Sequence, residues 1–496
     1  MSARGSADFF EERRSITMGC TALDPNMTAR DGVVFLNDRM PAGLFGGGGA
    51  GTDGDRVAWR LSPEPFWISP QTLAAIEQLG PDLLRFYRAL AALYQRSARG
   101  TAPAFVAEYL DIGKPESMVK LGRQNRFKSD VPGVIRPDLI LTSDGFIASE
   151  LDSIPGGMGF VGAMAFAYCQ LGFDTVGDVD GMLAGFAAML AATAGKPAPT
   201  TAVVVSQESD DYRAELAWLA NAMNERGLGE TYVCRPEEIV FTEESLFVRL
   251  PDGEEKKIDV LYRNFELFDL LNVPKQDLIL YAARHNRVKM TPPPKAHLEE
   301  KLAFALLHNA ALAKFWTAEL GDAFPRLRAI FPQTWILDPR PLPPQAAIVG
   351  LNAGPEPIGD WSQLIPLGKS ERDFVVKPSG YSELAWGSRG VKVANDLTKE
   401  DWQSTLEAAL ASYDRTPYIL QRFHKGKRVK VPYLDRKSDA IADLDGRVRL
   451  CPYYFVANDE VKLGGILATI APADKRLIHG MSDAIMSPCA VRENGY

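Results

Sequence analysis

The chain has 496 residues, of which 46% are hydrophobic and 24% are charged, and its formal net charge is −8 at pH 7. This composition is typical of a soluble globular protein, and the length predicts two or three sub-domains. A nucleic-acid-binding protein usually carries a basic stripe, and none stands out in this acidic chain. The local basic cluster at 425–430 suits a small anionic ligand better than a polyanion, so no nucleic-acid partner is expected.

The cysteines and the apolar segments indicate the compartment. The five cysteines are scattered and form no CxxC pair, so neither a disulfide framework nor a zinc site is expected. The polar N-terminus lacks the apolar core of a signal peptide, and the most apolar stretch, 182–194, is too short to span a bilayer. We therefore expect a cytoplasmic protein with no membrane partner.

A glycine-rich run, 46–54 (GGGGAGTDG), is the first notable feature along the chain. A phosphate-binding P-loop ends in GKS or GKT, and this run lacks that ending, so a flexible loop is expected instead. The periodicity of apolar residues then predicts a helix over 72–96.

An acidic β-hairpin is predicted next. Two short apolar strands flank the turn sequence SDG at 143–145. Asp138 and Glu150 then lie near the same open end, and Glu150 and Asp152 point to one face of their strand. Three converging carboxylates require a cation, and their oxygens favour Mg²⁺. An exposed hairpin with solvated acids is the alternative.

A βαβ module is predicted from 201 to 290, because a buried strand, an amphipathic helix and a second strand follow one another. No GxGxxG follows the first strand, which disfavours a dinucleotide-binding oxidoreductase. After a proline-rich linker, a long helix is predicted over 297–320, and a second proline-rich segment at 339–357 precedes the C-terminal part.

A lysine-bearing strand forms the second candidate site. Lys377 ends the apolar sequence FVVK, and the glycine-containing segment 380–390 leads to another strand. A lysine beneath such a segment suits a nucleotide's phosphates, because backbone N–H groups add donors. The apolar strand 418–423 has the composition of an adenine pocket. A surface lysine on an edge strand is the alternative, which the apolar neighbours of Lys377 disfavour.

Together, these segments resemble the ATP-grasp superfamily. RPD at 136–138 with ELDSIPGG at 150–157 is similar to the metal-binding end of ligases such as D-alanine–D-alanine ligase. FVVKP, the glycine-containing segment and ILQ at 419–421 are similar to the ATP-clamping lobe. The hairpin precedes the clamp, an order that resembles the circularly permuted branch of glutathionylspermidine synthetase. The sequences YRNF at 262–265 and LGGI at 463–466 also resemble that branch.

The resemblance implies an α/β (α+β) chain with a circularly permuted ATP-grasp fold and a βαβ pre-ATP-grasp-like module. The expected divisions are an N-terminal region with the metal-binding hairpin at 1–200, the substrate-binding module at 201–290, a helical segment and proline-rich linker at 291–360, and the ATP-clamping lobe with the closing segment at 361–496. A homodimer is compatible with these expectations.

The resemblance also implies an ATP- and Mg²⁺-dependent ligase that joins a carboxylate to an amine through an acyl phosphate, on small-molecule or peptide-like substrates. The implied catalytic residues are Arg136 and Lys377, the metal ligands are Asp138, Glu150 and Asp152, the ATP contacts are Lys301, Lys377, Gly380, Gly387, Ser388, Arg389, Gly390 and Gln421, and the substrate contacts are Arg263 and Asn264. A helix-surface position is the alternative for Lys301, and an ordinary ion pair is the alternative for Arg263.

Two features depart from that branch. Asp152 stands where asparagine is usual, and the sequence LAT at 467–469 stands where an arginine is expected, which leaves the acceptor open. An ATP-grasp phosphotransferase without ligation and a nucleotide-binding protein without turnover are the alternative functions, although the retained acids and Lys377 disfavour the second. His479, near the closing segment, is expected to be a polar core residue.

Overall fold

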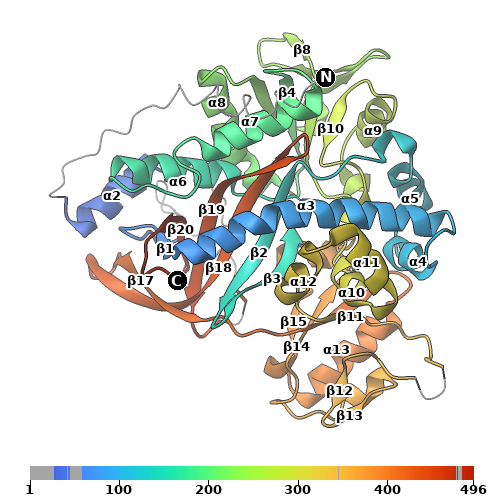
Figure 1. Cartoon of the computed structure of the whole chain (residues 1–496). Coiled ribbons are helices and arrows are strands. Elements are labelled where there is room, and N and C mark those ends of the chain that lie inside the picture. Colours follow the sequence, from blue (N-terminus) through green and yellow to red (C-terminus); the bar gives the residue numbers. More distant parts are fainter. Residues whose placement is uncertain are drawn as a thin grey trace.

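A seven-stranded sheet, an antiparallel four-stranded sheet and a parallel four-stranded sheet form the framework of the molecule (Figure 1). The computed structural model describes residues 27–41, 43–44, 59–152, 154–343, 346–475, 477–478 and 483–496. The glycine-rich run 46–54 and His479 lie outside the described residues. The first short helix of the described part is α2 (Ala29–Arg39).

The seven-stranded sheet combines strands that lie far apart in the sequence. In spatial order it contains β1 (Phe66–Ile68), β20 (Ile485–Val491), β19 (Glu460–Pro472), β18 (Ala440–Ala457), β2 (Val134–Thr142) and β3 (Gly145–Asp152), and β17 (Arg428–Asp435) pairs with β18. β2 and β3 form the predicted hairpin, in which Thr142 pairs with Gly145 and Asp138 with Glu150. The hairpin prediction is confirmed, and two of its acids face each other across the ladder.

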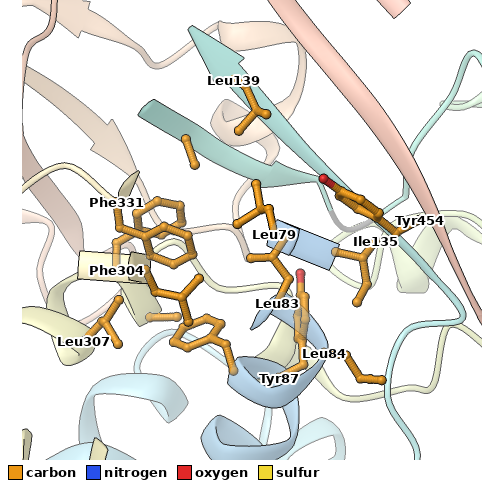
Figure 2. Packing of buried hydrophobic residues seen from close by; sticks show 14 of the residues in the cluster. Leu79, Leu83, Leu84, Tyr87, Ile135, Leu139, Phe304, Leu307, Phe331 and Tyr454 are labelled. Atoms are coloured by element: carbon orange, nitrogen blue, oxygen red, sulfur yellow. The ribbon is translucent and has the colours of Figure 1, made fainter. Parts of the chain in front are cut away.

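The long helix α3 (Pro70–Ala98) covers one face of this sheet. It begins after Ser69, whose hydroxyl accepts a hydrogen bond from the backbone N–H of Thr72 at 3.1 Å. Figure 2 shows its apolar side, with Leu79 and Leu83, packed beside Ile135 of β2. The predicted helix over 72–96 is confirmed.

Along β18, the opposite face of the sheet is polar at Arg447 and Arg449 and apolar from Cys451 onward. Successive side chains of a strand point to opposite faces, so Cys451, Tyr453 and Phe455 share the face that packs against α6 (Met158–Gln170) and α7 (Gly181–Ala194). On the same face, Arg447 and Arg449 precede them and line a cavity instead of a helix. The uncovered part of this face is therefore polar.

The predicted βαβ module is confirmed as a parallel sheet. Its strands, in spatial order, are β10 (Lys289–Thr291), β9 (Val260–Asn264), β4 (Thr200–Val205) and β5 (Glu230–Cys234). The helices α8 (Arg213–Glu225) and α9 (Gln276–Arg284) belong to this module, and β6 (Ile239–Phe241), β7 (Leu246–Arg249) and β8 (Glu255–Lys257) form a small antiparallel sheet within it.

The antiparallel four-stranded sheet carries the lysine strand. Its order is β11 (Thr334–Ile336), β16 (Tyr418–Arg422), β14 (Phe374–Pro378) and β15 (Lys392–Val393), and α13 (Lys399–Ala411) shares its hydrophobic cluster. The two-stranded ribbon of β12 (Asn352–Ala353) and β13 (Glu356–Pro357) lies beside it (Figure 1). β14 is buried along its whole length, because α13 and the neighbouring strands enclose it.

The helical segment differs from its prediction. A continuous helix over 297–320 was expected, whereas the structure has α10 (Ala303–His308) and α11 (Ala313–Leu320), separated by a short 3₁₀ turn. Asn309 breaks the helix, because its backbone is extended and its side chain caps the turn through Ala311 N at 2.9 Å. The remaining helices are α4 (Phe105–Asp111), α5 (Glu116–Gly122) and α12 (Ala323–Ile330).

The cysteines correct one further expectation. The scattered cysteines indicated no disulfide framework, whereas Cys169 is disulfide-bonded in the structure. Cys234, Cys451 and Cys489 are free and buried. Within the described ranges, we find no helix that combines the length and the apolar character needed to cross a bilayer.

Glu215 connects the parallel module to α6. Its fully buried carboxylate accepts hydrogen bonds from the backbone N–H groups of Gly157 at 2.8 Å, Gly159 at 2.5 Å and Phe160 at 3.2 Å, at the start of that helix. Burial outweighs these bonds and raises the pKa of Glu215 from 4.5 to about 7. The contact between the parallel module and α6 therefore contains a carboxyl group that can change its protonation state.

We predict that this contact makes stability depend on pH. Between pH 4.5 and about 7, folded Glu215 holds a proton that the unfolded chain has released. Its contribution is therefore fully present below pH 4.5, and roughly 3 kcal/mol is lost as the pH rises through 7. Urea unfolding at several pH values should show the stability of Glu215→Gln rising relative to wild type with pH. Two parallel pH profiles would contradict the prediction.

Candidate functional site

Two cavities meet at the polar part of the seven-stranded sheet. The inter-sheet cavity, between this sheet and the antiparallel sheet, encloses about 110 Å³, and the module cavity, between the same sheet and the parallel module, encloses about 260 Å³. Residues of the inter-sheet cavity include Ile147, Val375, Lys377, Val393, Gln421, Arg422, Lys425 and Arg447. Residues of the module cavity include Arg136, Asp152, Tyr212, Glu266, Phe268, Glu299, Lys301 and Leu467.

Asp138, Glu150 and Arg449 line both cavities. We call these three residues the shared wall. Asp138 and Glu150 are cross-strand partners in the β2–β3 hairpin, and Arg449 comes from β18, the strand on the other side of β2. The two cavities therefore meet where the pairing of three strands brings two carboxylates and one guanidinium together.

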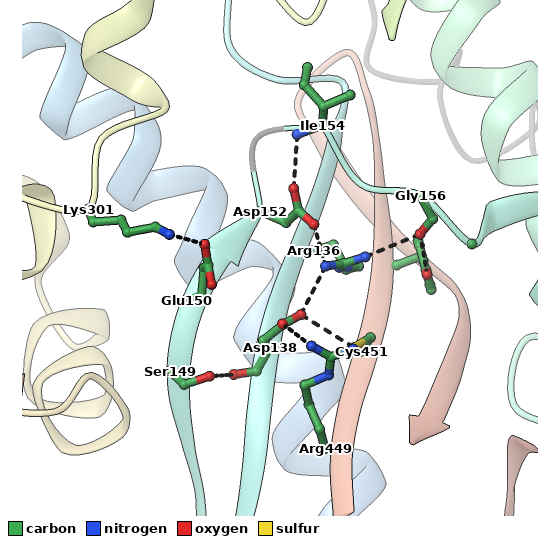
Figure 3. Close-up of polar contacts among 12 residues, drawn as sticks. Arg136, Asp138, Ser149, Glu150, Asp152, Ile154, Gly156, Lys301, Arg449 and Cys451 are labelled. Atoms are coloured by element: carbon green, nitrogen blue, oxygen red, sulfur yellow. Dashed lines mark hydrogen bonds and ion pairs between the residues drawn. The ribbon is translucent and has the colours of Figure 1, made fainter. Parts of the chain in front are cut away.

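Asp138 is the most connected acid of the shared wall (Figure 3). Its carboxylate lies 2.8 Å from Nη1 of Arg449, 3.1 Å from Nη2 of Arg136 and 3.3 Å from Sγ of Cys451. Burial opposes ionisation of Asp138, but Arg449 and Arg136 outweigh it and hold its pKa below the usual value. Asp138 is therefore ionised and buried, which excludes a solvated position for this acid.

Asp152 depends on Arg136. The two side chains form a close ion pair, and Asp152 also accepts a hydrogen bond from the backbone N–H of Ile154 at 3.1 Å. Burial raises the pKa of Asp152, although Arg136 opposes the shift. A second nitrogen of Arg136 donates to the carbonyl oxygen of Gly156 at 3.2 Å. Arg136 therefore fixes the open end of the hairpin, and both residues border the module cavity alone.

Lys377 is buried beneath the inter-sheet cavity. Its ammonium group donates to the carbonyl oxygen of Ser149 at 2.7 Å and to Oε1 of Gln421 at 2.9 Å, and Gln421 Nε2 in turn donates to Thr334 Oγ1 at 3.2 Å. Burial lowers the pKa of Lys377 to about 8, with Lys301 acting in the same direction. The contact between Lys377 and Ser149 joins the antiparallel sheet to the acidic hairpin, and its burial excludes a surface position.

Lys301 reaches the shared wall from the helical segment. Its ammonium group lies 2.5 Å from Oε1 of Glu150, and the residue is only 7% exposed, which excludes the helix-surface alternative. Burial alone would lower the pKa of Lys301, but Glu150 outweighs it and raises that pKa. Lys301 therefore lines the module cavity and Lys377 the inter-sheet cavity, with Glu150 in the wall of both.

The glycine-containing segment 380–390 lies over the module cavity more than over the inter-sheet cavity. Gly380 and Gly387 line the former, whereas Val391 and Val393, just beyond the segment, line the latter. Residues Glu383–Ser388 form a 3₁₀ helix rather than an open loop. Gly390 donates its N–H to the carbonyl oxygen of Leu384 at 2.7 Å, and Arg389 lies 3.5 Å from Glu208 on the parallel module.

Glu300 anchors the start of this segment. Its carboxylate accepts hydrogen bonds from Ser379 Oγ at 2.7 Å and from the backbone N–H of Gly380 at 2.9 Å, and it lies 2.7 Å from Nζ of Lys114. Both charged side chains are almost fully buried. A Cβ atom at Gly380 would approach the carbonyl oxygen of Glu299 to 1.9 Å, so this position requires glycine. The start of the segment is therefore fixed in place.

Arg263 and Asn264 lie at the carboxyl end of β9, and neither lines the two cavities. Arg263 is fully buried and pairs with Glu299, as the ion-pair alternative expected. Asn264 is also fully buried, and neither atom of its amide has a hydrogen-bond partner among the described residues. Of the two predicted substrate contacts, only Asn264 has side-chain polar atoms without any hydrogen-bond partner among the described residues.

The three predicted metal ligands fit a Mg²⁺ ion that binds together with a phosphate ligand, and not a metal ion held by protein side chains alone. Across the described part of the chain, no three His, Cys, Asp or Glu residues cluster closely enough to hold a metal ion by themselves. Mg²⁺ typically takes one or two carboxylates and completes its shell with phosphates and water. Asp138 and Glu150, which face both cavities, supply such carboxylates, whereas Asp152 borders the module cavity alone.

Sequence reasoning missed Arg449, Glu300 and Tyr212. Arg449 alternates with Arg447 on an apolar strand, a pattern that could have indicated a polar patch on one face. It is also the register partner of Thr469, in the segment where an arginine was expected, so an arginine reaches this part of the sheet from the neighbouring strand. Glu300 gave no comparable signal, because its contacts with Lys114, Ser379 and Gly380 join residues that are far apart in the sequence. Tyr212, which lines the module cavity, gave none either.

Comparison with known proteins bears on the fold. The sequence matches no family profile and none of the curated proteins. The structure is similar to that of a glutathione synthetase-like effector from Globodera pallida in its apoform, with a TM-score of 0.56 and 12% identity over 95% of this chain and 98% of the other. A provisionally assigned gamma-glutamylcysteine synthetase from Methylobacillus flagellatus aligns with a TM-score of 0.38 and 11% identity, over 81% of this chain and 86% of the other, a similarity too low to carry an argument. The chain thus has a mixed α/β fold of the glutathione-synthetase-like ATP-grasp type.

Proposed function

We propose that this protein is an ATP- and Mg²⁺-dependent ligase that joins a carboxylate to an amine through an acyl phosphate. The observation that carries the proposal is the shared wall, because a phosphoryl group that moves between the two cavities passes Asp138, Glu150 and Arg449. The ATP-grasp type of fold supports this reaction class. The chain order, with the hairpin before the lysine strand, favours the permuted branch that includes glutathionylspermidine synthetase.

The inter-sheet cavity suits a nucleoside triphosphate. Apolar side chains, among them Ile147, Val375 and Val393, form walls for a flat base. Its cations are Lys377, Arg422, Lys425, Arg447 and Arg449, against the two carboxylates Asp138 and Glu150. This excess of positive charge suits a polyphosphate.

The module cavity suits the carboxylate and amine substrates. Tyr212, Glu266 and Phe268 follow the carboxyl ends of β4 and β9, the edge at which open parallel sheets bind ligands. Carboxylates outnumber cations in this cavity, which favours an amine and a metal-bound phosphate over a second polyanion.

The residues then have separate tasks. Mg²⁺, when bound beside Asp138 and Glu150, would neutralise phosphate charge. Lys377 would exchange its contact with Ser149 or Gln421 for a phosphate oxygen, and Lys301 would hold Glu150 in place. Segment 380–390 would exclude water from the acyl phosphate, which hydrolyses readily. We propose that Arg136 orients Asp138 and Asp152, because the same two carboxylates engage it in the structure.

We predict that nucleotide binding depends on Mg²⁺ and stabilises the protein. At a ligand concentration a hundredfold above Kd, the stabilisation should be about 2.7 kcal/mol. Melting curves with ATP or ADP should therefore shift upward when Mg²⁺ is present and much less when EDTA replaces it. The absence of a shift with either magnesium nucleotide would argue against a nucleotide site.

We also predict that Glu150→Gln abolishes turnover and leaves the fold intact, because the variant loses one carboxylate at the shared wall. The expected loss is on the order of 10²-fold or more in kcat, measured as ADP and phosphate release with candidate carboxylates and amines. Asp144→Asn is the matched control, since Asp144 is an exposed acid at the turn of the same hairpin. If Glu150→Gln kept wild-type activity, Glu150 would not be a functional residue of this site.

The same assay separates the proposal from a phosphotransferase. A ligase should release phosphate only when carboxylate and amine are both present, with one amide formed for each ADP. A phosphotransferase should instead accumulate a phosphorylated product without any amine. ATP binding without either product would indicate a nucleotide-binding protein.

A further inference from the structure

We propose that Arg449 is a catalytic residue that binds the γ-phosphoryl group while it passes from the nucleotide to the substrate carboxylate. This inference rests on the proposed function and adds a catalytic residue that the sequence analysis did not name. Two properties of Arg449 support this assignment, namely its position between the two cavities and its partly engaged guanidinium group, together with the chemistry of the transfer.

The position of Arg449 is shared by no other cation of the described residues. Arg449 lines both cavities, whereas Lys377 and Arg447 line the inter-sheet cavity, and Arg136 and Lys301 line the module cavity. Its backbone is fixed in the middle of the sheet, where it pairs with Ile140 of β2 and with Thr469 of β19. The guanidinium group is therefore held at the junction by a rigid strand rather than by a loop.

The guanidinium of Arg449 is only partly engaged. Nη1 donates to Oδ2 of Asp138 at 2.8 Å, whereas Nη2 has no hydrogen-bond or ion-pair partner among the described residues. Nε is buried without a partner there, as is Nε of Arg136. Arg136 differs, because its two terminal nitrogens already serve Asp152, Asp138 and the carbonyl oxygen of Gly156. Arg449 therefore retains donors for a ligand, whereas a ligand at Arg136 would have to displace the hairpin.

The transfer needs such a cation at the junction. The bond between the γ-phosphorus and the β,γ-bridging oxygen breaks, and its electron pair leaves with ADP. A new bond forms between the same phosphorus and a carboxylate oxygen, and no proton is transferred in this step. Negative charge spreads over the three other phosphoryl oxygens, where a guanidinium, always charged and with several planar donors, is most effective. Because Arg449 lines both cavities, it can contact these oxygens while the phosphoryl group is still on the nucleotide and after it has reached the carboxylate.

The experiment compares the affinities for two nucleotides in wild type and in two variants of Arg449. Equilibrium dissociation constants are measured by calorimetry for Mg-ADP and for Mg²⁺ with the β,γ-imido analogue of ATP, in wild type, Arg449→Met and Arg449→Lys. Because ADP lacks the γ-phosphoryl group, Arg449→Met should raise the dissociation constant of the analogue by about tenfold or more and that of ADP by less than about threefold. Arg449→Lys should recover part of the loss for the analogue, and it carries the test if Arg449→Met does not fold.

Arg447→Met is the matched control, because Arg447 lies on the same strand and face and borders the inter-sheet cavity alone. It should change the affinity for both nucleotides by similar factors. Equal factors for the two nucleotides in Arg449→Met and Arg449→Lys, or no change in either, would overturn the assignment of Arg449. If wild type binds neither nucleotide, the proposed function itself fails, and this result is distinct from the first.

Discussion

The arrangement of the site depends on one buried carboxylate, that of Asp138. Two guanidinium groups compensate its charge, Arg136 from its own strand and Arg449 from a strand 311 residues later. Burying such a charge costs several kcal/mol unless it is paired, and removal of one partner from a buried pair typically costs about 3 to 5 kcal/mol. The register of β18 against β2 and the position of both arginines are therefore coupled, and the shared wall is a consequence of that coupling.

The same constraint explains why two cavities meet here and not elsewhere on the sheet. The apolar side chains of β18 beyond Cys451 recruit α6 and α7, which cover that part of the face. Arg447 and Arg449 cannot be covered by an apolar helix without losing their hydration or their partners. The polar part of the face therefore stays open, and the parallel module and the antiparallel sheet approach it from two sides without closing it.

Long-range polar contacts then set the position of the antiparallel sheet relative to the hairpin. Lys377 bonds to Ser149, 228 residues earlier, and Glu300 bonds to Ser379 and Gly380, at the base of the glycine-containing segment. These contacts have different consequences. The Lys377 contact leaves the ammonium group weakly compensated, because burial lowers the pKa of Lys377 to about 8. The Glu300 contact includes the buried ion pair with Lys114 and fixes the start of the segment.

The sequence by itself determined the local elements and the type of fold. The β2–β3 hairpin, the parallel module and the buried strand of Lys377 follow from turn residues and from the period of apolar side chains, which act between near neighbours. Tertiary structure decided which cations reach the hairpin. Lys301 and Arg449 do so and Arg263 does not, because each outcome depends on pairings between distant strands and on burial that no local pattern encodes. The prediction of a continuous helix over 297–320 was wrong for a local reason. The Asn309 side chain caps a turn through the backbone N–H of Ala311, and the period of apolar residues does not reveal such a cap.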